Sequence, residues 1–181
     1  MATCSTVITA ARRAGLYVAV LTSDPQIAGL SGVTVIDEDP SLSGLNAQLE
    51  SAILRIEAPA SGLLILHADL PLATPGAVLG FLSQAPPAPS VTIVKSRDGG
   101  TNAMLLRPPR RFSLAYGTNS AELHIAAAEA SGLAVRVVDI PALALDLDTP
   151  DDLDALMAVF GGAMTPAGRI VAAALARAGR R

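Results

Sequence analysis

The chain has few of the residues that mark nucleic-acid surfaces. Aromatic side chains make up only 3% of its 181 residues and tryptophan is absent, so a stacking platform for single-stranded bases is not expected. Charged residues amount to 16%, and the formal net charge is -3. A strongly basic field is therefore missing, and nucleic acid is excluded as a partner.

Cysteine and long apolar runs are also scarce. Cys4 is the single cysteine, which excludes an internal disulfide and a thiolate metal cluster. The apolar run at Leu63–Leu66 is interrupted directly by His67, so it is too short to span a membrane. Arg12 and Arg13 fall where a signal peptide needs its apolar core. These features predict a cytoplasmic protein with no membrane contact.

Short β-rich runs alternate with longer helical patterns, which is typical of an α/β fold with crossover helices. Hydrophobic residues make up 51% of the chain, enough for a sizeable core, and neither a repeat nor a long linker divides it. We therefore expect a single domain over residues 1–181. The expected strands are 17–22, 34–36, 62–66, 90–94, 103–107 and 135–140, and the expected helices are 3–14, 44–56, 75–84, 121–131, 151–160 and 167–178.

Two runs predict how the strands pair. The continuous apolar run Gly62–Leu66 favours a central strand with parallel neighbours. Ser90–Val94 and Ala103–Arg107 are joined by a short turn over residues 96–100, with no space for a helix. These two strands should form an antiparallel excursion in a sheet that is otherwise mostly parallel.

Asp69 is the first candidate site residue, because it follows the expected strand 62–66 at once. In open α/β sheets, ligands bind beyond the carboxyl ends of the strands, so Asp69 is well placed to hold a metal or a phosphate. The alternative is that Asp69 only accepts hydrogen bonds from loop amides before Pro71. The neighbouring His67 is interpreted as a loop residue and not as a general base.

The acidic segment 145–153 (LDLDTPDDL) contains a helix start. Thr149 is a suitable N-cap and Pro150 suits the first helical position. Asp151 and Asp152 complement the positive end of the helix dipole. Capping therefore explains half of the segment.

Capping does not explain Asp146 and Asp148. In an extended segment, residues two apart point to one face, about 6.6 Å apart, while Leu145 and Leu147 face the other way. Two carboxylates so placed repel each other unless a cation lies nearby. Mg²⁺ commonly takes one or two carboxylates together with substrate phosphates, so the pair predicts a magnesium site.

Glycines and hydroxyls gather in two further segments, Asp98–Ala103 and Tyr116–Ser120. Glycine lets the backbone approach a phosphate closely, and Thr101 and Ser120 offer hydroxyl donors. Ser120 also begins a predicted helix, whose N-terminus favours anions. The alternative is an ordinary glycine turn followed by a serine cap.

Together these motifs resemble the 2-phospho-L-lactate and phosphoenolpyruvate guanylyltransferases of deazaflavin coenzyme F-420 biosynthesis. Residues 98–109 (DGGTNAMLLRPP) resemble the family's GTNALLLRPP signature. The other matches follow in the family's order: GLN at 44–46, ADLPL at 68–72, YGxxSxxxH at 116–124, and ALALDLDTPDDL at 142–153 beside LALDIDTPEDL.

The resemblance implies a three-layer α/β/α, Rossmann-like nucleotidyltransferase fold, as in the molybdenum-cofactor enzymes. It implies that Asp69, Asp146 and Asp148 are catalytic and hold Mg²⁺. The acceptor phosphate would attack the α-phosphate of GTP and expel pyrophosphate. The acceptor would be phosphoenolpyruvate, 2-phospho-L-lactate or 3-phosphoglycerate.

The resemblance also implies the substrate contacts. Thr101, Gly117 and Ser120 would receive the phosphate and carboxylate of the small acid, and Asn46 would lie near the guanine. The alternatives are a molybdopterin-type or other nucleotidyltransferase and a non-catalytic, nucleotide-binding relative.

One departure concerns the start of the chain. The family begins with a strand and a basic triphosphate loop, whereas this sequence begins at the helix near Thr3. We therefore interpret the chain as an N-terminally truncated member. The missing strand would leave a sheet edge that stays unpaired or pairs with another chain, as in a homodimer.

Overall fold

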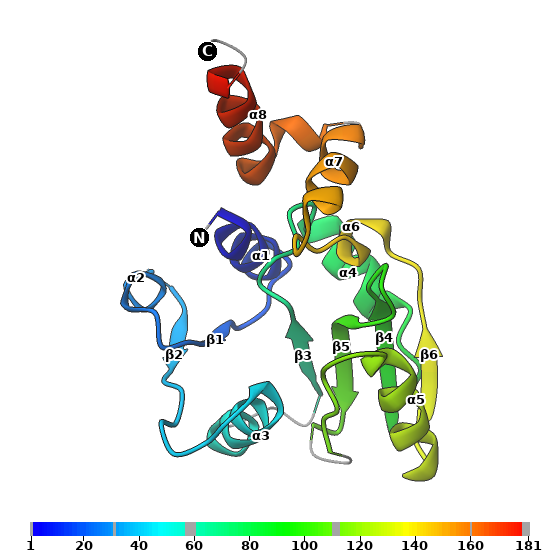
Figure 1. Cartoon of the computed structure of the whole chain (residues 1–181). Coiled ribbons are helices and arrows are strands. Elements are labelled where there is room, and N and C mark those ends of the chain that lie inside the picture. Colours follow the sequence, from blue (N-terminus) through cyan, green and yellow to red (C-terminus); the bar gives the residue numbers. More distant parts are fainter. Residues whose placement is uncertain (1, 31, 57–60, 110–112, 160, 179–181) are drawn as a thin grey trace.

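The computed structural model describes residues 2–30, 32–56, 61–109, 113–159 and 161–178 (Figure 1). Its strands are β1 (Ala19–Leu21), β2 (Thr34–Ile36), β3 (Leu63–Leu66), β4 (Ser90–Lys95), β5 (Thr101–Arg107) and β6 (Ala134–Val137). Its helices are α1 (Ala2–Arg13), α2 (Pro25–Ala28), α3 (Leu45–Arg55), α4 (Pro75–Ser83), α5 (Ser120–Ala130), α6 (Pro141–Ala144), α7 (Pro150–Ala158), the 3₁₀ helix η1 (Gly162–Met164) and α8 (Pro166–Ala178).

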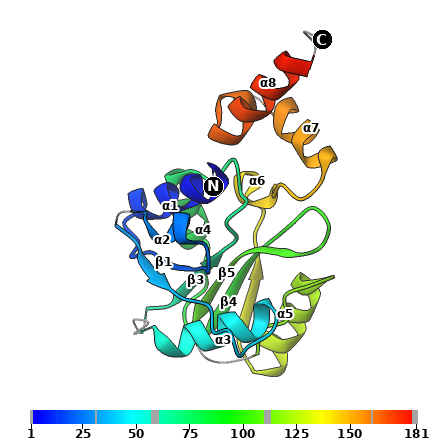
Figure 2. The ribbon, with the colours of Figure 1, turned by 60° about the vertical axis from the view of Figure 1, so that its left-hand side comes forward.

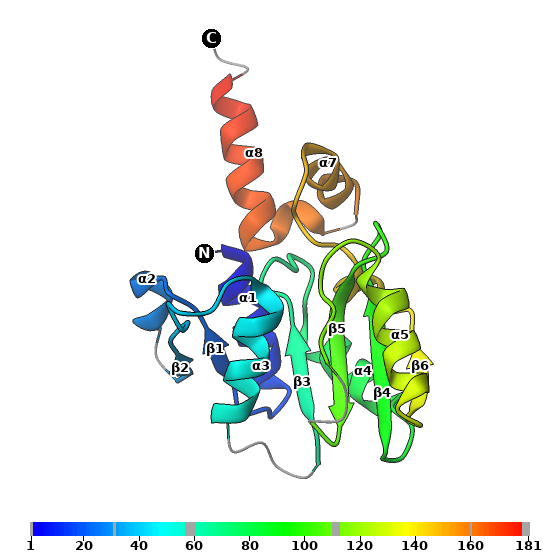
Figure 3. The same ribbon diagram turned by 60° about the horizontal axis from the view of Figure 1, so that its bottom comes forward.

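The strands form two sheets in the described residues. β1 and β2 pair in parallel, and the second sheet has the order β3-β5-β4-β6. β5 is antiparallel to both β3 and β4, while β6 is parallel to β4. Figures 1 and 3 show the two-stranded sheet on the β3 side. The α/β fold and the antiparallel excursion are confirmed. The pairing is mixed and not mostly parallel, because β5 returns between two strands of opposite direction.

The expected central, parallel position of β3 is wrong for the described residues. β3 lies at the edge of its sheet and pairs only with β5, in antiparallel register from Leu63 opposite Leu106 to Leu66 opposite Ala103. Its continuous apolar run has another cause. Alternate side chains of β3 pack into the two different cores described below. The apolar run therefore reflects burial of both faces of the strand and does not indicate the direction of the neighbouring strands.

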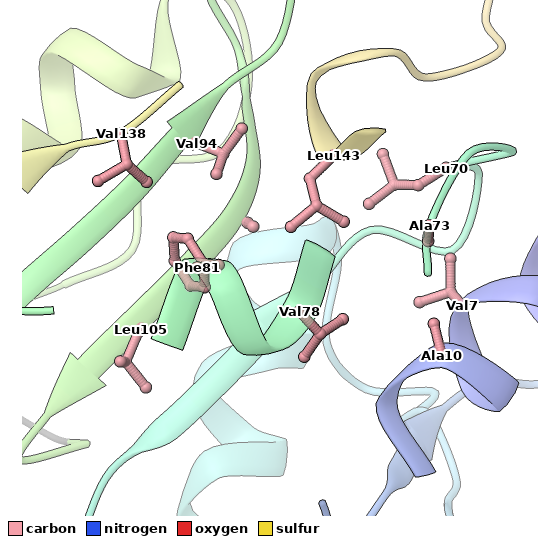
Figure 4. Packing of buried hydrophobic residues seen from close by; sticks show 11 residues of the cluster. Val7, Ala10, Leu70, Ala73, Val78, Phe81, Val94, Leu105, Val138 and Leu143 are labelled. Carbon is pink, nitrogen blue, oxygen red and sulfur yellow. The ribbon is translucent and has the colours of Figure 1, made fainter. Parts of the chain in front are cut away.

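Helices cover both faces of the four-stranded sheet. In Figure 3, α3 and α5 lie in front of the strands and α4 lies behind them, and Figure 2 shows the same layers from another side. One core joins α1 and α4 to one face, where Phe81 and Val78 lie close to Leu105 and Leu143 (Figure 4). The other core joins α3 and α5 to the opposite face. The three-layer α/β/α arrangement is confirmed.

The strand sequences explain the two cores. In β5, Ala103 and Leu105 face the first core while Met104 and Leu106 face the second, and all four are at most 4% exposed. Successive side chains of a strand point to opposite faces, so a strand buried on both sides needs apolar residues throughout. Burying each large side chain contributes about 1.5–3 kcal/mol.

The C-terminal helices form a smaller unit around Leu145, Leu156 and Ala167. α8 extends away from the sheets in all three overall views (Figures 1–3). A Cβ on Gly162 would lie 1.7 Å from the Leu156 carbonyl oxygen, so only glycine permits this close packing of η1 on α7. Among the described helices, none combines the length and apolar character needed to cross a membrane.

Three short helices were not expected. α2 and α6 each have four residues, and η1 has three. Asp24 caps α2 by accepting a 2.8 Å hydrogen bond from the Gln26 N–H. Elements this short bury too few residues to show a periodic pattern. The expected end of helix 151–160 at Phe160 lies outside the described residues.

Candidate active site

The candidate site lies at one end of the four-stranded sheet, where β3 and β4 end and β5 begins. Because β5 is antiparallel to both neighbours, its first residues share an edge with their last residues. The His67 N–H donates a 3.0 Å hydrogen bond to the Asn102 carbonyl, which ties the start of the Asp69 turn to β5. Ligands of open α/β sheets bind at this end of the strands.

A β-bulge at the start of β5 sets the direction of two site residues. Val94 of β4 pairs with Ala103 and Lys95 pairs with Thr101, so Asn102 is an extra residue without a partner in β4. Such a bulge re-aims the side chains beside it. Thr101 consequently contacts α5, while Asn102 lies close enough to Asp146 to act on its pKa.

Two of the three predicted metal-binding carboxylates interact across the site. The pKa of Asp146 is raised, first by burial and then by the negative charges of Asp69 and Asp148, against the opposing effects of its own backbone and Asn102. Asp69 Oδ1 is buried and has no hydrogen-bond partner among the described residues. Asp69 and Asp146 therefore present negative charge that a cation would offset.

Asp148 differs from the other two carboxylates. It is exposed, and the segment 145–148 is irregular and not an extended strand. The shared face expected for Asp146 and Asp148 is therefore only partly formed. Leu145 and Leu147 do pack together against the C-terminal core. In the described ranges, no three His, Cys, Asp or Glu side chains are grouped closely enough to hold a metal.

The capping residues of α7 are confirmed. Thr149 and Asp152 form a capping box, and Pro150 occupies the first turn. Hydrogen bonds from the Thr149 hydroxyl and backbone lower the pKa of Asp152. The Asp148 N–H also donates to Asp152, at 3.3 Å. Asp152 thus supports the loop that carries the candidate ligands.

The loop before α5 is held by side chains from two helices. Three consecutive backbone N–H groups each donate to a side chain: Leu114 to Glu50 at 3.0 Å, Ala115 to His124 at 2.9 Å, and Tyr116 to Asn46 at 2.7 Å. Glu50 and Asn46 come from α3 and His124 from α5. The loop leads into Gly117, whose φ of +137° favours glycine.

Asn46 is placed beside this loop. Besides accepting from the Tyr116 N–H, its Nδ2 donates a 3.0 Å hydrogen bond to the Tyr116 carbonyl. The side chain amide therefore bonds both backbone groups of one residue, which holds the loop against α3. The contact with guanine that the family resemblance implies stays a prediction.

Thr101 and Ser120 are brought together, as the sequence suggested. The Ser120 hydroxyl donates to Thr101 Oγ1 at 3.2 Å, and both residues are 1% exposed. Thr101 Oγ1 also lies 3.0 Å from His124 Nδ1. Ser120 opens α5, and its N–H donates to the Gly117 carbonyl, so the loop and helix start form one unit.

Buried polar atoms without partners are concentrated here. In the described residues, His67 Nε2, Asp69 Oδ1, Asn102 Nδ2 and the Tyr116 hydroxyl have no hydrogen-bond partner, and only Thr92 Oγ1 and Arg107 Nε share this property elsewhere. The Tyr116 ring lies 5.3 Å from His67 and 4.8 Å from His124. Unpaired buried polar groups are costly, so water or a ligand is expected to form hydrogen bonds with these atoms.

Sequence reasoning missed three supporting residues. Asn102 and His124 lie within the motifs at 98–109 and 116–124 but were not predicted as site residues, and Glu50 lies in none of the motifs. The signal for His124 was its place four residues after Ser120, which is one helical turn. No pattern in the sequence connects Glu50 with a loop 64 residues away.

The fold is a three-layer α/β/α arrangement. It resembles the structure of a hypothetical transferase from Thermus thermophilus, with a TM-score of 0.59 and 20% identity over 83% of this chain and 85% of that one. The chain belongs to the family described as guanylyl transferase CofC like, whose model matches residues 3–166.

Curated relatives of that family are close in sequence. The chain is 41% identical over 157 residues to the phosphoenolpyruvate guanylyltransferase of Conexibacter woesei, covering 83% of this chain and 70% of the relative. It is 40% identical over 161 residues to the enzyme of the same name from Rubrobacter xylanophilus, covering 86% and 78%.

Proposed function

We propose that this chain joins GMP from GTP to a small phosphorylated carboxylic acid and releases pyrophosphate. The observation that carries the proposal is the meeting of two kinds of group at one sheet end. Asp69 and Asp146 are interacting carboxylates, and Thr101 and Ser120 are clustered hydroxyls. A reaction between two anions needs a place for a cation and a place for an anionic acceptor.

The carboxylates are suited to Mg²⁺. Asp69 and Asp146 would hold the ion, with Asp148 at its exposed side, and the partnerless Oδ1 of Asp69 fits such a ligand. When bound, the metal would offset the negative charge shared by the triphosphate and the attacking phosphate. Mg²⁺ usually keeps ligand positions for water and substrate phosphates, which agrees with a site of few protein ligands.

The acceptor would lie at Thr101, Gly117 and Ser120. A Cβ at Gly117 would meet nothing within 4 Å, so space is open beside this backbone. The N-terminus of α5, an 11-residue helix, favours an anion there. Related enzymes are named for phosphoenolpyruvate, 3-phospho-D-glycerate and 2-phospho-L-lactate, which supports this class of acceptor.

The proposed reaction forms a bond between an acceptor phosphate oxygen and the α-phosphorus of GTP. The bond from that phosphorus to the bridging oxygen of the β-phosphate breaks, and pyrophosphate leaves with its electron pair. The acceptor phosphate is already ionised at neutral pH, so no general base is required. The residues of the chain bind and orient two anions and do not move a proton.

The experiment is product analysis. The purified chain is incubated with GTP, Mg²⁺ and, in separate reactions, phosphoenolpyruvate, 2-phospho-L-lactate or 3-phosphoglycerate, and each mixture is separated by anion-exchange chromatography with mass detection. The expected product contains one GMP joined to one acid, and Asp146→Asn should not form it. A folded wild-type protein that binds GTP but forms no joined product with any of the three acids would refute the proposal.

The cytoplasmic location and self-association expected from the sequence stay predictions. Light scattering on the purified chain over a range of concentrations measures its mass. A mass of twice the 18.4 kDa chain at every concentration is the result expected of a stable homodimer.

A further inference from the structure

His124 lies at the junction of the loop and the hydroxyl cluster. The ring is fully buried and packs edge-on against Tyr116. Each ring nitrogen has a hydrogen-bond contact: Nε2 with the Ala115 N–H at 2.9 Å and Nδ1 with Thr101 Oγ1 at 3.0 Å. His124 therefore connects the loop before Gly117 with the start of β5.

The hydrogen-bond directions select one tautomer. A backbone N–H can only donate, so Nε2 must carry no proton in order to accept from Ala115. Burial, and second the charge of His67, lower the pKa of His124 to about 4, so the ring is neutral near pH 7. A neutral imidazole has a single N–H, which is then at Nδ1 and donates to Thr101.

The same reasoning settles the role of the Thr101 hydroxyl. Its oxygen accepts from His124 Nδ1–H and from the Ser120 hydroxyl, and these two bonds fill both lone pairs. Its own hydrogen has no acceptor among the described residues. Thr101 is only 1% exposed, so this hydrogen needs an ordered water or a bound ligand atom as its acceptor. A buried donor without a partner costs about 1–3 kcal/mol.

We infer that His124 is a positioning residue that holds the Thr101 hydroxyl as a hydrogen-bond donor toward an oxygen of the anionic acceptor. The inference rests on the proposed function, because it assigns that hydrogen to the acceptor phosphate or carboxylate. His124 itself does not touch the acceptor. It acts by filling one lone pair of Thr101 and by holding Ala115 in place.

Paired variants separate these two actions. Thr101→Val removes the hydroxyl, and Thr101→Ser keeps it as the matched control. His124→Gln places an amide oxygen near the Nε2 position, where it can accept from Ala115, but removes the donor to Thr101. His124→Asn places an amide near the Nδ1 position and serves as the conservative rescue.

Steady-state kinetics should show a selective effect on the acceptor. Thr101→Val and His124→Gln should each raise the KM for the acceptor about tenfold or more, with little change in the KM for GTP. Thr101→Ser should raise the acceptor KM less than Thr101→Val, and His124→Asn less than His124→Gln, because each keeps a hydrogen bond at Thr101 that its partner variant lacks. The double variant Thr101→Val/His124→Gln should be no worse than Thr101→Val alone, because His124 acts through Thr101.

Two measurements do not depend on turnover. Long-range ¹H–¹⁵N spectra of the His ring report which nitrogen is protonated, and His67→Asn leaves one histidine of the two to observe. Calorimetry reports phosphoenolpyruvate binding to Thr101→Val and to the wild type. An Nδ1–H signal and weaker binding to Thr101→Val are expected, and both remain readable if catalysis is absent.

Three results would overturn the inference. A protonated Nε2 would contradict the tautomer. Equal phosphoenolpyruvate affinity of Thr101→Val and wild type would show that an ordered water takes the hydrogen. Additive losses in the double variant would show that His124 has a packing role only. Failure of the proposed function differs from all three, since it abolishes joined product in the wild type as well.

Discussion

Thr149 and Asp152 cap each other at the start of α7. The Asp152 carboxylate accepts from the Thr149 N–H at 2.9 Å and from its hydroxyl at 2.7 Å, and the Asp152 N–H donates back to Thr149 Oγ1 at 3.3 Å. This reciprocal pair fixes the end of the segment that carries Asp146. Asp152 therefore has a structural role, unlike Asp146, which is proposed to take part in the reaction.

Asp152→Ala should lower stability and leave most of the turnover. Loss of an N-terminal capping partner costs about 1 kcal/mol, and urea denaturation measures this change. The rate with saturating Mg²⁺ should remain within a few-fold of the wild type. An inactive variant with unchanged stability would place Asp152 in the chemistry instead.

Asp146→Asn should behave in the opposite way. Burial and the charge of Asp69 disfavour the Asp146 carboxylate, so the neutral amide should leave stability in metal-free buffer unchanged or higher. Turnover should fall on the order of a hundredfold or more, as for loss of a group that stabilises transition-state charge. Thermal unfolding with and without Mg²⁺ and GTP supplies the second readout. A variant that gains as much stability from these ligands as the wild type would contradict a metal role.

The buried His124 should make stability depend on pH. Its pKa falls from 6.5 to about 4 on folding, so the unfolded chain binds the proton more readily. The stabilising effect is complete above pH 6.5 and is lost as the pH falls toward 4, up to about 3 kcal/mol in total. Urea denaturation between pH 7.5 and 4.5 measures the slope.

His124→Gln is the control for that slope, since it has no titrating group at this position. The difference between wild type and variant isolates His124 from the carboxylates, including Asp146, whose raised pKa acts in the opposite direction. Parallel curves for the two proteins would show that the folded histidine is not held neutral.

Gly117→Ala should disturb the acceptor side through the backbone. The φ of +137° is unfavourable for alanine although no atom lies within 4 Å of the added Cβ, so strain of about 1–3 kcal/mol is expected. The KM for the acceptor should rise. Gly80→Ala in α4, where the added Cβ also meets nothing, should instead raise stability by about 0.5–1 kcal/mol. Equal effects of the two substitutions would argue against a special conformation at Gly117.

The sequence predicted the elements that bury an apolar face and the motifs that lie within one turn or loop. β2 was placed correctly at Thr34–Ile36, and the capping of α7 followed from local residue preferences. The pattern of apolar residues shows which faces of an element are buried. The apolar run of β3 therefore predicted burial of both faces, but it could not predict that the neighbouring strand is antiparallel.

Contacts between distant segments were beyond such reasoning. The hydrogen bonds from Asn46 and Glu50 to the loop before α5 span 70 and 64 residues, and the bulge at Asn102 depends on its register with β4. These contacts arise when the layers pack. These long-range contacts determine where the hydroxyls of Thr101 and Ser120 lie. The sequence motifs identified the two residues but not their positions.

Pyrophosphate release is the most direct test of the account. The 181-residue chain is supplied with GTP and Mg²⁺, and with phosphoenolpyruvate, 2-phospho-L-lactate or 3-phosphoglycerate in separate reactions, while Asp146→Asn provides the background. Release above that background with at least one acid, and none without an acid, is the predicted result. A folded chain that releases no pyrophosphate with any of the three acids would contradict the claim that this site transfers GMP.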